Sequence, residues 1–156
     1  MAKEIERKFL VKDMPSIANN NESYLIEQYY ISTNPEIRLR MVQNLNSNQV
    51  NYYMTQKSDG TEVREEIETE VDKSFYINNQ EKMIGHVIRK TRTRIPLENK
   101  LIAELDVYHG IDLRVVEVEF KNKSEADAFI PPQWFGEEVT DNKQYKNKNL
   151  AIKGKI

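Results

Sequence analysis

The sequence predicts a mainly β (α+β) domain in which eight antiparallel strands form a barrel or a strongly curled sheet. First, apolar and polar residues alternate along most of the chain, which is the period of a half-buried strand. Second, most connections are short, which favours antiparallel neighbours because parallel pairs need long crossovers. Third, the 156 residues include only 5 Gly and 5 Pro and no low-complexity linker, so we expect a single domain over residues 1–156.

Each predicted strand is a segment with this alternation. The segments are about 3–11, 23–32, 36–43, 48–57, 61–71, 85–95, 100–108 and 112–120. Turn-like residues separate several of them, at 44–48, 58–60 and 109–110. We expect one helix near 72–83, opened by Asp72, and another near 123–130, where Ser124 precedes an acidic first turn. Residues 141–156 could hold a third.

The composition excludes several classes of protein. The 23 Lys and Arg residues are balanced by 25 Asp and Glu, and the net charge of −2 argues against a bulk nucleic-acid binder. With 38% apolar residues the chain can build a core, which argues against disorder. The absence of Cys excludes a disulfide scaffold and a thiolate metal site. No apolar run approaches a membrane span or a signal peptide, so we expect a cytoplasmic protein with no membrane partner.

The charged residues gather on one face of seven predicted strands, usually at positions i and i+2. Arg38 and Arg40 share a face, as do Lys90, Arg92 and Arg94. Cross-strand ion pairs on a solvated surface, each contributing about 0.2–1 kcal/mol, would explain any single strand. The repetition of Arg-x-Arg and Glu-x-Glu, with apolar residues opposite, favours a charged interior instead. If the sheet closes, these side chains line its lumen and helices cover the apolar outer face, the inverse of a usual small barrel.

A lumen with charges of both signs suits a polyanion bound together with a divalent cation. Arg provides forked donors to phosphate oxygens, and Lys provides compact positive charge. Carboxylates are hard oxygen ligands for Mg²⁺ or Mn²⁺. Cations alone would bind phosphate without reaction, whereas added acid clusters suggest metal-assisted attack of water on a phosphoryl group. A Walker-type loop is absent from the sequence, and His86 and His109 stand alone.

An ordered set of charged motifs runs along the predicted strands: Glu4-x-Glu6-x-Lys8, Arg38-x-Arg40, Thr55-x-Lys57, Arg64-x-Glu66-x-Glu68, Lys90-x-Arg92, Glu104-x-Asp106 and Glu117-x-Glu119. This set resembles the CYTH superfamily, also called triphosphate tunnel metalloenzymes. The tail, with Trp134-Phe135-Gly136 and Tyr145-Lys146-Asn147, is similar to the short bacterial inorganic triphosphatase branch. The resemblance implies a closed eight-stranded antiparallel barrel, the triphosphate tunnel.

The resemblance also implies roles for individual residues. The implied metal ligands are Glu4, Glu6, Glu117 and Glu119, with Asp106 near them. The implied substrate-binding residues are Lys8, Arg38, Arg40, Lys57 and Arg92, with Lys90 beside them. Glu66 and Glu68, across the tunnel, would bind a second metal or orient water, and so join Lys8 as catalytic residues. Further candidates are Arg94 and Lys143 for phosphate, Arg64 as a partner of the acids, and Tyr29, Tyr30 and Tyr53 at the mouth or in packing.

The activity implied is divalent-metal-dependent hydrolysis of a triphosphate, best matched by inorganic tripolyphosphate going to pyrophosphate and phosphate. The alternatives within the family are thiamine triphosphate hydrolysis, RNA 5′-triphosphate removal and cyclisation of ATP. A polyphosphate- or nucleotide-binding module without turnover is the non-enzyme alternative, and the paired Glu clusters argue against it. We expect Mg²⁺ or Mn²⁺ as cofactor, no nucleic-acid partner, and a monomer or homodimer.

Overall fold

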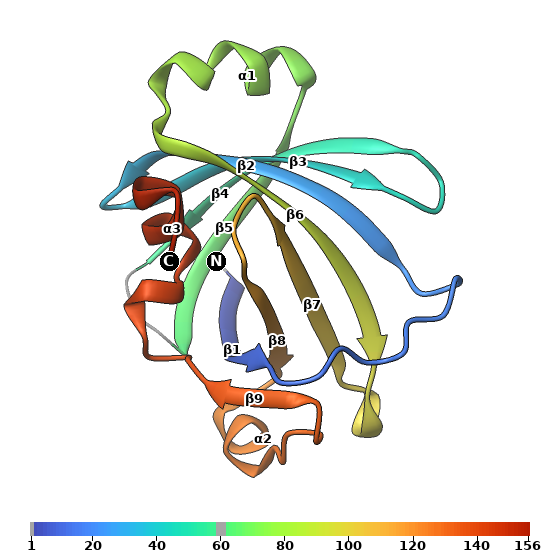
Figure 1. Ribbon diagram of the computed structural model, residues 1–156. Coiled ribbons are helices and arrows are strands. Elements are labelled where there is room, and N and C mark those ends of the chain that lie inside the picture. Colours follow the sequence, from blue (N-terminus) through green and yellow to red (C-terminus); the bar gives the residue numbers. More distant parts are fainter. Residues whose placement is uncertain (1, 59–61) are drawn as a thin grey trace.

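Eight strands close into an antiparallel barrel (Figure 1). The computed structural model describes residues 2–58 and 62–156, with only the backbone of Ala2. Neighbouring strands follow the order β5-β4-β3-β2-β6-β7-β8-β1, and pairing of β1 with β5 completes the ring, which confirms the predicted fold. The strands are β1 (Ala2–Val11), β2 (Ser23–Thr33), β3 (Glu36–Asn44), β4 (Val50–Lys57), β5 (Val63–Val71), β6 (Ile84–Pro96), β7 (Ile102–His109) and β8 (Arg114–Phe120).

Short helices lie where the sequence predicts them. The predicted helix at 72–83 is α1 (Lys73–Asn78) followed by a 3-10 turn, η1 (Gln80–Lys82), and Asp72 caps it by accepting a hydrogen bond from the Phe75 amide. The second is α2 (Lys123–Ala128), but its cap is Asn122 rather than Ser124. The third is α3 (Asn147–Lys153); two further 3-10 turns are η2 (Glu98–Lys100) and η3 (Lys143–Tyr145). Asp59 and Gly60 of the predicted turn, and Thr61 of the predicted fifth strand, lie outside the described residues.

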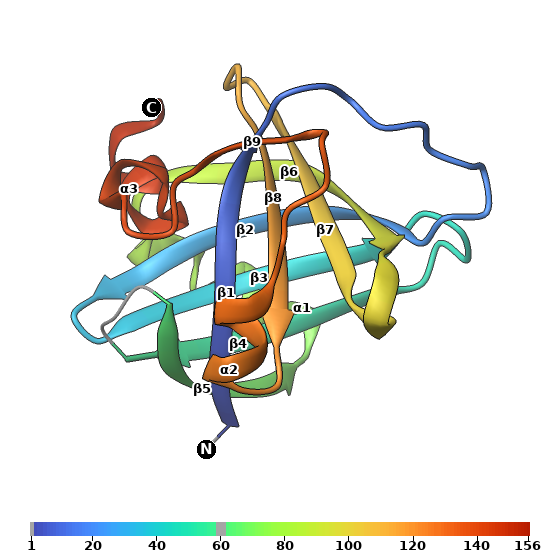
Figure 2. The ribbon, with the colours of Figure 1, turned by 90° about the horizontal axis from the view of Figure 1, so that it is seen from below.

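A ninth strand, β9 (Phe135–Glu138), is absent from the sequence prediction. It pairs with the end of β1, matching Phe9 with Glu138 and Val11 with Phe135. The beginning of β1 pairs with β5, so one edge of β1 serves two strands in succession (Figure 2). Arg7 on β1 fixes this seam by donating to both carboxylate oxygens of Glu138, at 2.9 and 2.7 Å.

Two apolar layers cover the outside of the barrel. Below the barrel in Figure 1, α2 and β9 cover Phe9, Val116 and Val118 on the outer face of β1 and β8. On the opposite side, Tyr76 of α1 packs on Tyr29 and other residues of β2, β3 and β4. Burial of these apolar faces provides the main driving force for folding. It also turns the charged residues of the same strands inward, since successive side chains alternate between faces.

A third apolar layer fills one end of the lumen. Tyr108 faces Lys90 and Val115 faces Asp106 across neighbouring strands, so both point into the barrel. They pack with Ile88 and with Leu150 and Ala151 of α3, which lies across this end. The lumen is therefore closed at the α3 end by apolar packing. Within the described residues, no helix has the length and apolar character needed to cross a membrane.

Gly85 permits the close approach of α3 to β6. Its φ of +74° disfavours other residues, and an added Cβ would lie 2.7 Å from the Ile152 Cα, against helix backbone. We expect Gly85→Ala to lower the free energy of unfolding by about 2–4 kcal/mol, combining backbone strain and overpacking. Gly110→Ala is the matched control because Gly110 also has positive φ, +83°, but open space around it. Urea denaturation should show the smaller loss for Gly110→Ala; equal losses would remove the role of Gly85 in seating α3.

Candidate active site

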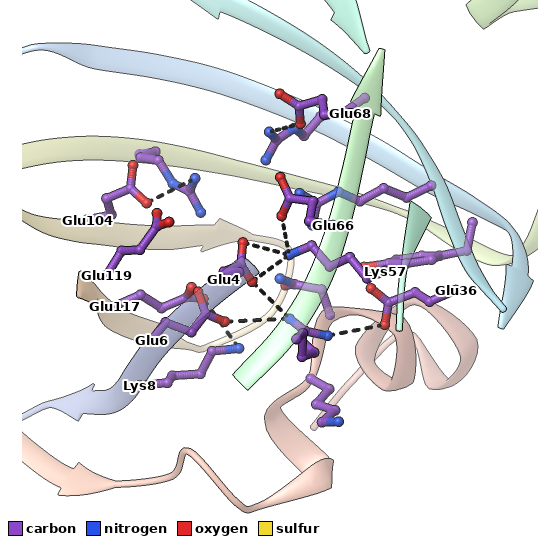
Figure 3. Close-up of a pocket in the computed structure, with 17 residues that line it drawn as sticks. Glu4, Glu6, Lys8, Glu36, Lys57, Glu66, Glu68, Glu104, Glu117 and Glu119 are labelled. Carbon is purple, nitrogen blue, oxygen red and sulfur yellow. Dashed lines mark hydrogen bonds and ion pairs between the residues drawn. The ribbon is translucent and has the colours of Figure 1, made fainter. Parts of the chain in front are cut away.

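The inward faces of the strands enclose a strongly charged cavity of about 210 Å³ (Figure 3). Its mouth lies away from α3: the Glu68 and Glu104 side chains there are 35% and 30% exposed, whereas Lys57 deeper in the lumen is 6% exposed. The predicted inward orientation of the charged face is therefore confirmed. The lining residues are Glu4, Glu6, Lys8, Tyr30, Glu36, Arg38, Arg40, Lys57, Arg64, Glu66, Glu68, Arg92, Glu104, Glu117, Glu119, Lys146 and Asn147.

Carboxylates from β1, β5 and β8 crowd one side of the lumen. The register places Glu6 opposite Glu119 and Lys8 opposite Glu117. Lys57 reaches across from β4, with its Nζ 3.1 Å from Glu4 and 3.5 Å from Glu66. These acids outnumber the cations that reach them, which leaves a local excess of negative charge.

Arg64 stands among the same acids, as the sequence suggested for it. One terminal nitrogen lies 3.6 Å from Glu4 and 3.5 Å from Glu6, and the other lies 3.5 Å from Glu36. Lys8 contacts Glu117 at 3.4 Å and donates to the Tyr145 carbonyl at 3.1 Å. The basic side chains therefore hold the carboxylates in place from both sides.

The pKa values of the carboxyl groups reflect their mutual repulsion. Burial and the neighbouring Glu117 and Glu4 raise the pKa of Glu6 well above its usual value, and burial with Glu4 also raises that of Glu119. Burial and a hydrogen bond with Glu4 raise the pKa of Glu66 to about 7. Burial would raise the pKa of Glu4 as well, but Lys57 and the bond with Glu66 outweigh it and lower that pKa to about 2.

These carboxylates repel one another when they are ionised, and a divalent cation bound among them would relieve that repulsion. Carboxylate oxygens are also the hard ligands that such a cation prefers. Among residues 2–58 and 62–156, however, no three acidic or His side chains lie close enough together to coordinate a metal ion. The donor set fits Mg²⁺ or Mn²⁺, and it would need side-chain adjustment to surround either ion.

Arginines gather near the carboxylates. Arg38 is 7% exposed, its Nε is buried without a hydrogen-bond partner, and no carboxylate of the described residues lies within ion-pairing distance of it. Within the part of the chain that the structure describes, Arg40 forms an ion pair only with Glu68, at 3.5 Å. Burial and the nearby Arg38 and Arg92 lower the pKa of Arg40 to about 9. Guanidinium groups that repel one another in a buried site are arranged to receive an anion.

Two predicted site residues lie on the inward face of their strands without reaching the cavity surface. Lys90 and Asp106 are fully buried and contact each other at 2.8 Å, and neither lines the cavity. The predicted phosphate contact of Lys90 and metal contact of Asp106 therefore stay predictions, and the two residues are set apart from the rest of the predicted site by their burial. Of the further candidates, Tyr30 lines the cavity, whereas Tyr29, Tyr53, Arg94 and Lys143 do not.

Several lining residues received no role from the sequence. Glu36 shares the face of Arg38, and Glu104 belongs to a quoted motif, so alternation could have identified both. Lys146 and Asn147 enter the cavity from the start of α3, where no strand period reveals orientation. Asn147 also accepts a hydrogen bond from the Tyr108 hydroxyl, which ties α3 to the apolar layer.

Comparison with known families agrees with this geometry. The family model described as the CYTH domain matches residues 2–151. The chain belongs to the CYTH family. A curated CYTH relative, the inorganic triphosphatase of Nitrosomonas europaea, is 41% identical over 152 residues, covering 96% of this chain and 97% of that protein.

Two solved structures are similar to this chain along nearly its whole length. A crystal structure described as that of an inorganic triphosphatase is 39% identical, has a TM-score of 0.68 and covers 97% of this chain and 96% of its own. A Hippeastrum protein, described as an adenylyl cyclase candidate with dominant triphosphatase activity, is 15% identical with a TM-score of 0.59, covering 98% and 97% of the two chains. At that identity the Hippeastrum protein shows a shared fold alone.

Proposed function

We propose that this CYTH protein is a divalent-metal-dependent inorganic triphosphatase that hydrolyses tripolyphosphate to pyrophosphate and phosphate. The observation that carries the proposal is the meeting, in one lumen, of buried arginines short of carboxylate partners with a crowded set of carboxylates. A small polyanion would satisfy the first group and a divalent cation the second. The 41% identity to an inorganic triphosphatase over 96% of this chain supports the same activity.

The character of the cavity favours a substrate without an organic group. Of the described residues that line it, Tyr30 alone is aromatic, so a nucleobase or thiazolium ring finds little stacking surface. The apolar layer beneath α3 closes the inner end. A compact triphosphate can satisfy the cationic side chains without any further contact.

In the proposed mechanism Arg38, Arg40, Arg92, Lys57 and Lys8 bind the phosphate oxygens and fix the chain of three phosphates. Mg²⁺ or Mn²⁺, when bound, neutralises charge on the phosphoryl oxygens. The residues that would hold it are Glu4, Glu6, Glu117 and Glu119.

The hydrolytic step needs a water molecule and an acceptor for its proton. The water oxygen forms a bond to the terminal phosphorus while the bridging P–O bond breaks, and pyrophosphate leaves with the bonding electrons. Glu66, whose pKa of about 7 matches the role of a general base, accepts the water proton. Glu68, hydrogen-bonded to Thr55 at 2.9 Å, lies on the same strand face and would orient the water.

The test is release of phosphate from tripolyphosphate, ATP and thiamine triphosphate, each with Mg²⁺, with Mn²⁺ and with a chelator. We expect the highest kcat/KM with tripolyphosphate and loss of turnover in the chelator. Cyclic AMP formed from ATP would identify a cyclase instead. Tight tripolyphosphate binding with no turnover under any condition would identify a binding module.

Glu66 should control the acidic side of the pH profile. A general base must be ionised to accept a proton, so kcat/KM for tripolyphosphate should fall as the pH drops below about 7. We expect Glu66→Gln to lower kcat by about 100-fold and to remove this acidic decline. Steady-state rates across the pH range measure both effects. An acidic decline that persists unchanged in Glu66→Gln would assign the base to another group.

A further inference from the structure

A buried trio of charges forms part of the wall between β6 and β7. Asp106 lies directly opposite Arg92 in the strand register, and Lys90 follows on the same face of β6. Asp106 Oδ1 accepts a hydrogen bond from Arg92 Nε at 2.8 Å, and Oδ2 accepts one from Arg92 Nη2 at 3.0 Å. Lys90 Nζ lies 2.8 Å from the same Oδ2. Lys90 and Asp106 are both fully inaccessible to solvent.

This arrangement fixes the direction of one cavity-lining arginine. Two parallel hydrogen bonds define the plane of a guanidinium group, and they occupy the Nε and Nη2 side of Arg92. The remaining nitrogen, Nη1, points to the lumen, where it lies 3.5 Å from Glu104 at the mouth. Lys90 is held in turn by the face of the Tyr108 ring, with its Nζ 5.4 Å from the ring centroid.

The same contacts leave Asp106 poorly suited to bind a metal. Two hydrogen bonds from Arg92 and an ion pair with Lys90 already occupy its two oxygens. Two fixed positive charges beside the carboxylate would also repel a divalent cation. Lys90 lies on the inward face but is buried beside the apolar layer, and its charge is matched by Asp106, so it is equally poorly placed to contact phosphate.

We propose that Asp106 and Lys90 are positioning residues that aim the Arg92 guanidinium at the bound phosphates, and that neither contacts metal or substrate. The proposal rests on the proposed triphosphatase function, because it concerns how that site presents Arg92. It reassigns two residues to which family resemblance gives direct roles.

The decisive variant is Asp106→Asn, which keeps the size of the side chain but replaces one acceptor oxygen with a donor. Three readouts separate the roles: the exchange rate of the Arg92 Nε proton by NMR, tripolyphosphate affinity in EDTA by calorimetry, and Mn²⁺ affinity by electron paramagnetic resonance. We expect faster Arg92 Nε exchange, weaker tripolyphosphate binding and unchanged Mn²⁺ affinity. With metal present, kcat/KM should fall by about 100-fold, as misplacement of a substrate-positioning group predicts.

The double variant Lys90→Met/Asp106→Asn guards against a folding defect. It removes both charges of the buried pair, so no lysine is left without a counterion, while Arg92 still lacks its two-oxygen acceptor. We expect it to fold and to retain the fast Arg92 exchange and weak tripolyphosphate binding. Arg89→Met is the matched control. Arg89 lies on the outer face of β6, is 59% exposed and forms a 2.8 Å ion pair with Glu27 of the neighbouring strand β2. Its loss should change none of the readouts.

The outcomes distinguish this proposal from the proposed function. Weaker Mn²⁺ binding in Asp106→Asn, or Arg92 exchange equal to wild type, would overturn the positioning role. Recovery of wild-type tripolyphosphate affinity in the double variant would also overturn it, since charge balance would then explain the single variant. If the wild-type protein neither binds nor hydrolyses tripolyphosphate, the proposed function fails, and the Arg92 exchange rate still decides whether Asp106 holds the guanidinium.

Discussion

Glu6→Gln should greatly reduce turnover and at the same time make the metal-free protein more resistant to heat. The variant loses a hard anionic oxygen ligand from the carboxylate cluster, and we expect kcat/KM for tripolyphosphate to fall by about 1,000-fold, which corresponds to about 4 kcal/mol. The gain in stability has a separate cause. Burial, Glu117 and Glu4 hold the pKa of Glu6 above the unfolded value of 4.5, so ionisation of Glu6 costs the folded state free energy.

The sign of this effect fixes its pH dependence. When the pKa of an acid is higher in the folded state than in the unfolded state, the free energy of unfolding falls as the pH rises from the unfolded pKa through the folded pKa. Gln has no proton to lose, so the melting temperature of the variant should exceed that of wild type at neutral pH, by about 2–4 °C for each kcal/mol, and the difference should vanish near pH 4. Calorimetry in EDTA at several pH values measures this. Wild-type turnover in Glu6→Gln, or a lower melting temperature at neutral pH, would contradict the assignment to the repulsive cluster.

Arg38→Gln should cause a comparable loss of activity through the anion side of the lumen. Arg38 is buried, projects into the cavity and has no carboxylate of the described residues within ion-pairing distance, so its guanidinium is available to bind the phosphates. Removal of one preorganised donor to a reacting oxygen costs about 100- to 1,000-fold in rate, and charge strengthens the effect. We expect kcat/KM for tripolyphosphate to fall by about 1,000-fold.

A matched control separates this from a general loss of positive charge. Arg114→Gln removes a guanidinium from the exposed start of β8, and kcat/KM should stay near the wild-type value. Calorimetry in EDTA should also show weaker tripolyphosphate binding for Arg38→Gln alone. An unchanged kcat/KM in Arg38→Gln would place this residue outside the reaction.

The barrel and the identity of its inward face follow from sequence because a strand has a period of two residues. Arg38 and Arg40 alternate with apolar neighbours, and burial of those neighbours outside the barrel turns the two cations inward. The order of the charged pairs along the chain resembles that of the CYTH family, and this resemblance implies the roles of the individual residues. The match covers the strands that build the lumen, so most of the candidate site was predictable.

Alternation specifies the face of a strand but not the depth of a residue along the barrel axis. Lys90 and Asp106 occupy the predicted face, yet they lie next to the apolar layer and pair with each other instead of reaching the cavity. That layer depends on the docking of α3, which no local pattern reveals. Lys146 escaped prediction for the same reason, and β9 did so because four residues are too few to establish a period.

The docking of α3 on the barrel determines when, during synthesis, the cavity can become complete. β1 needs both β5 and β8 as neighbours, so a growing chain cannot close the ring until about residue 120 has left the ribosome. Even then the inner end stays unsealed until residues 147–153 arrive, and with them come the Lys146 and Asn147 contributions to the cavity. A chain that ends before this helix would carry the side chains proposed to bind phosphate and metal in a barrel whose inner end is open to water. The cavity lining is thus complete only after α3 has been synthesised and has docked.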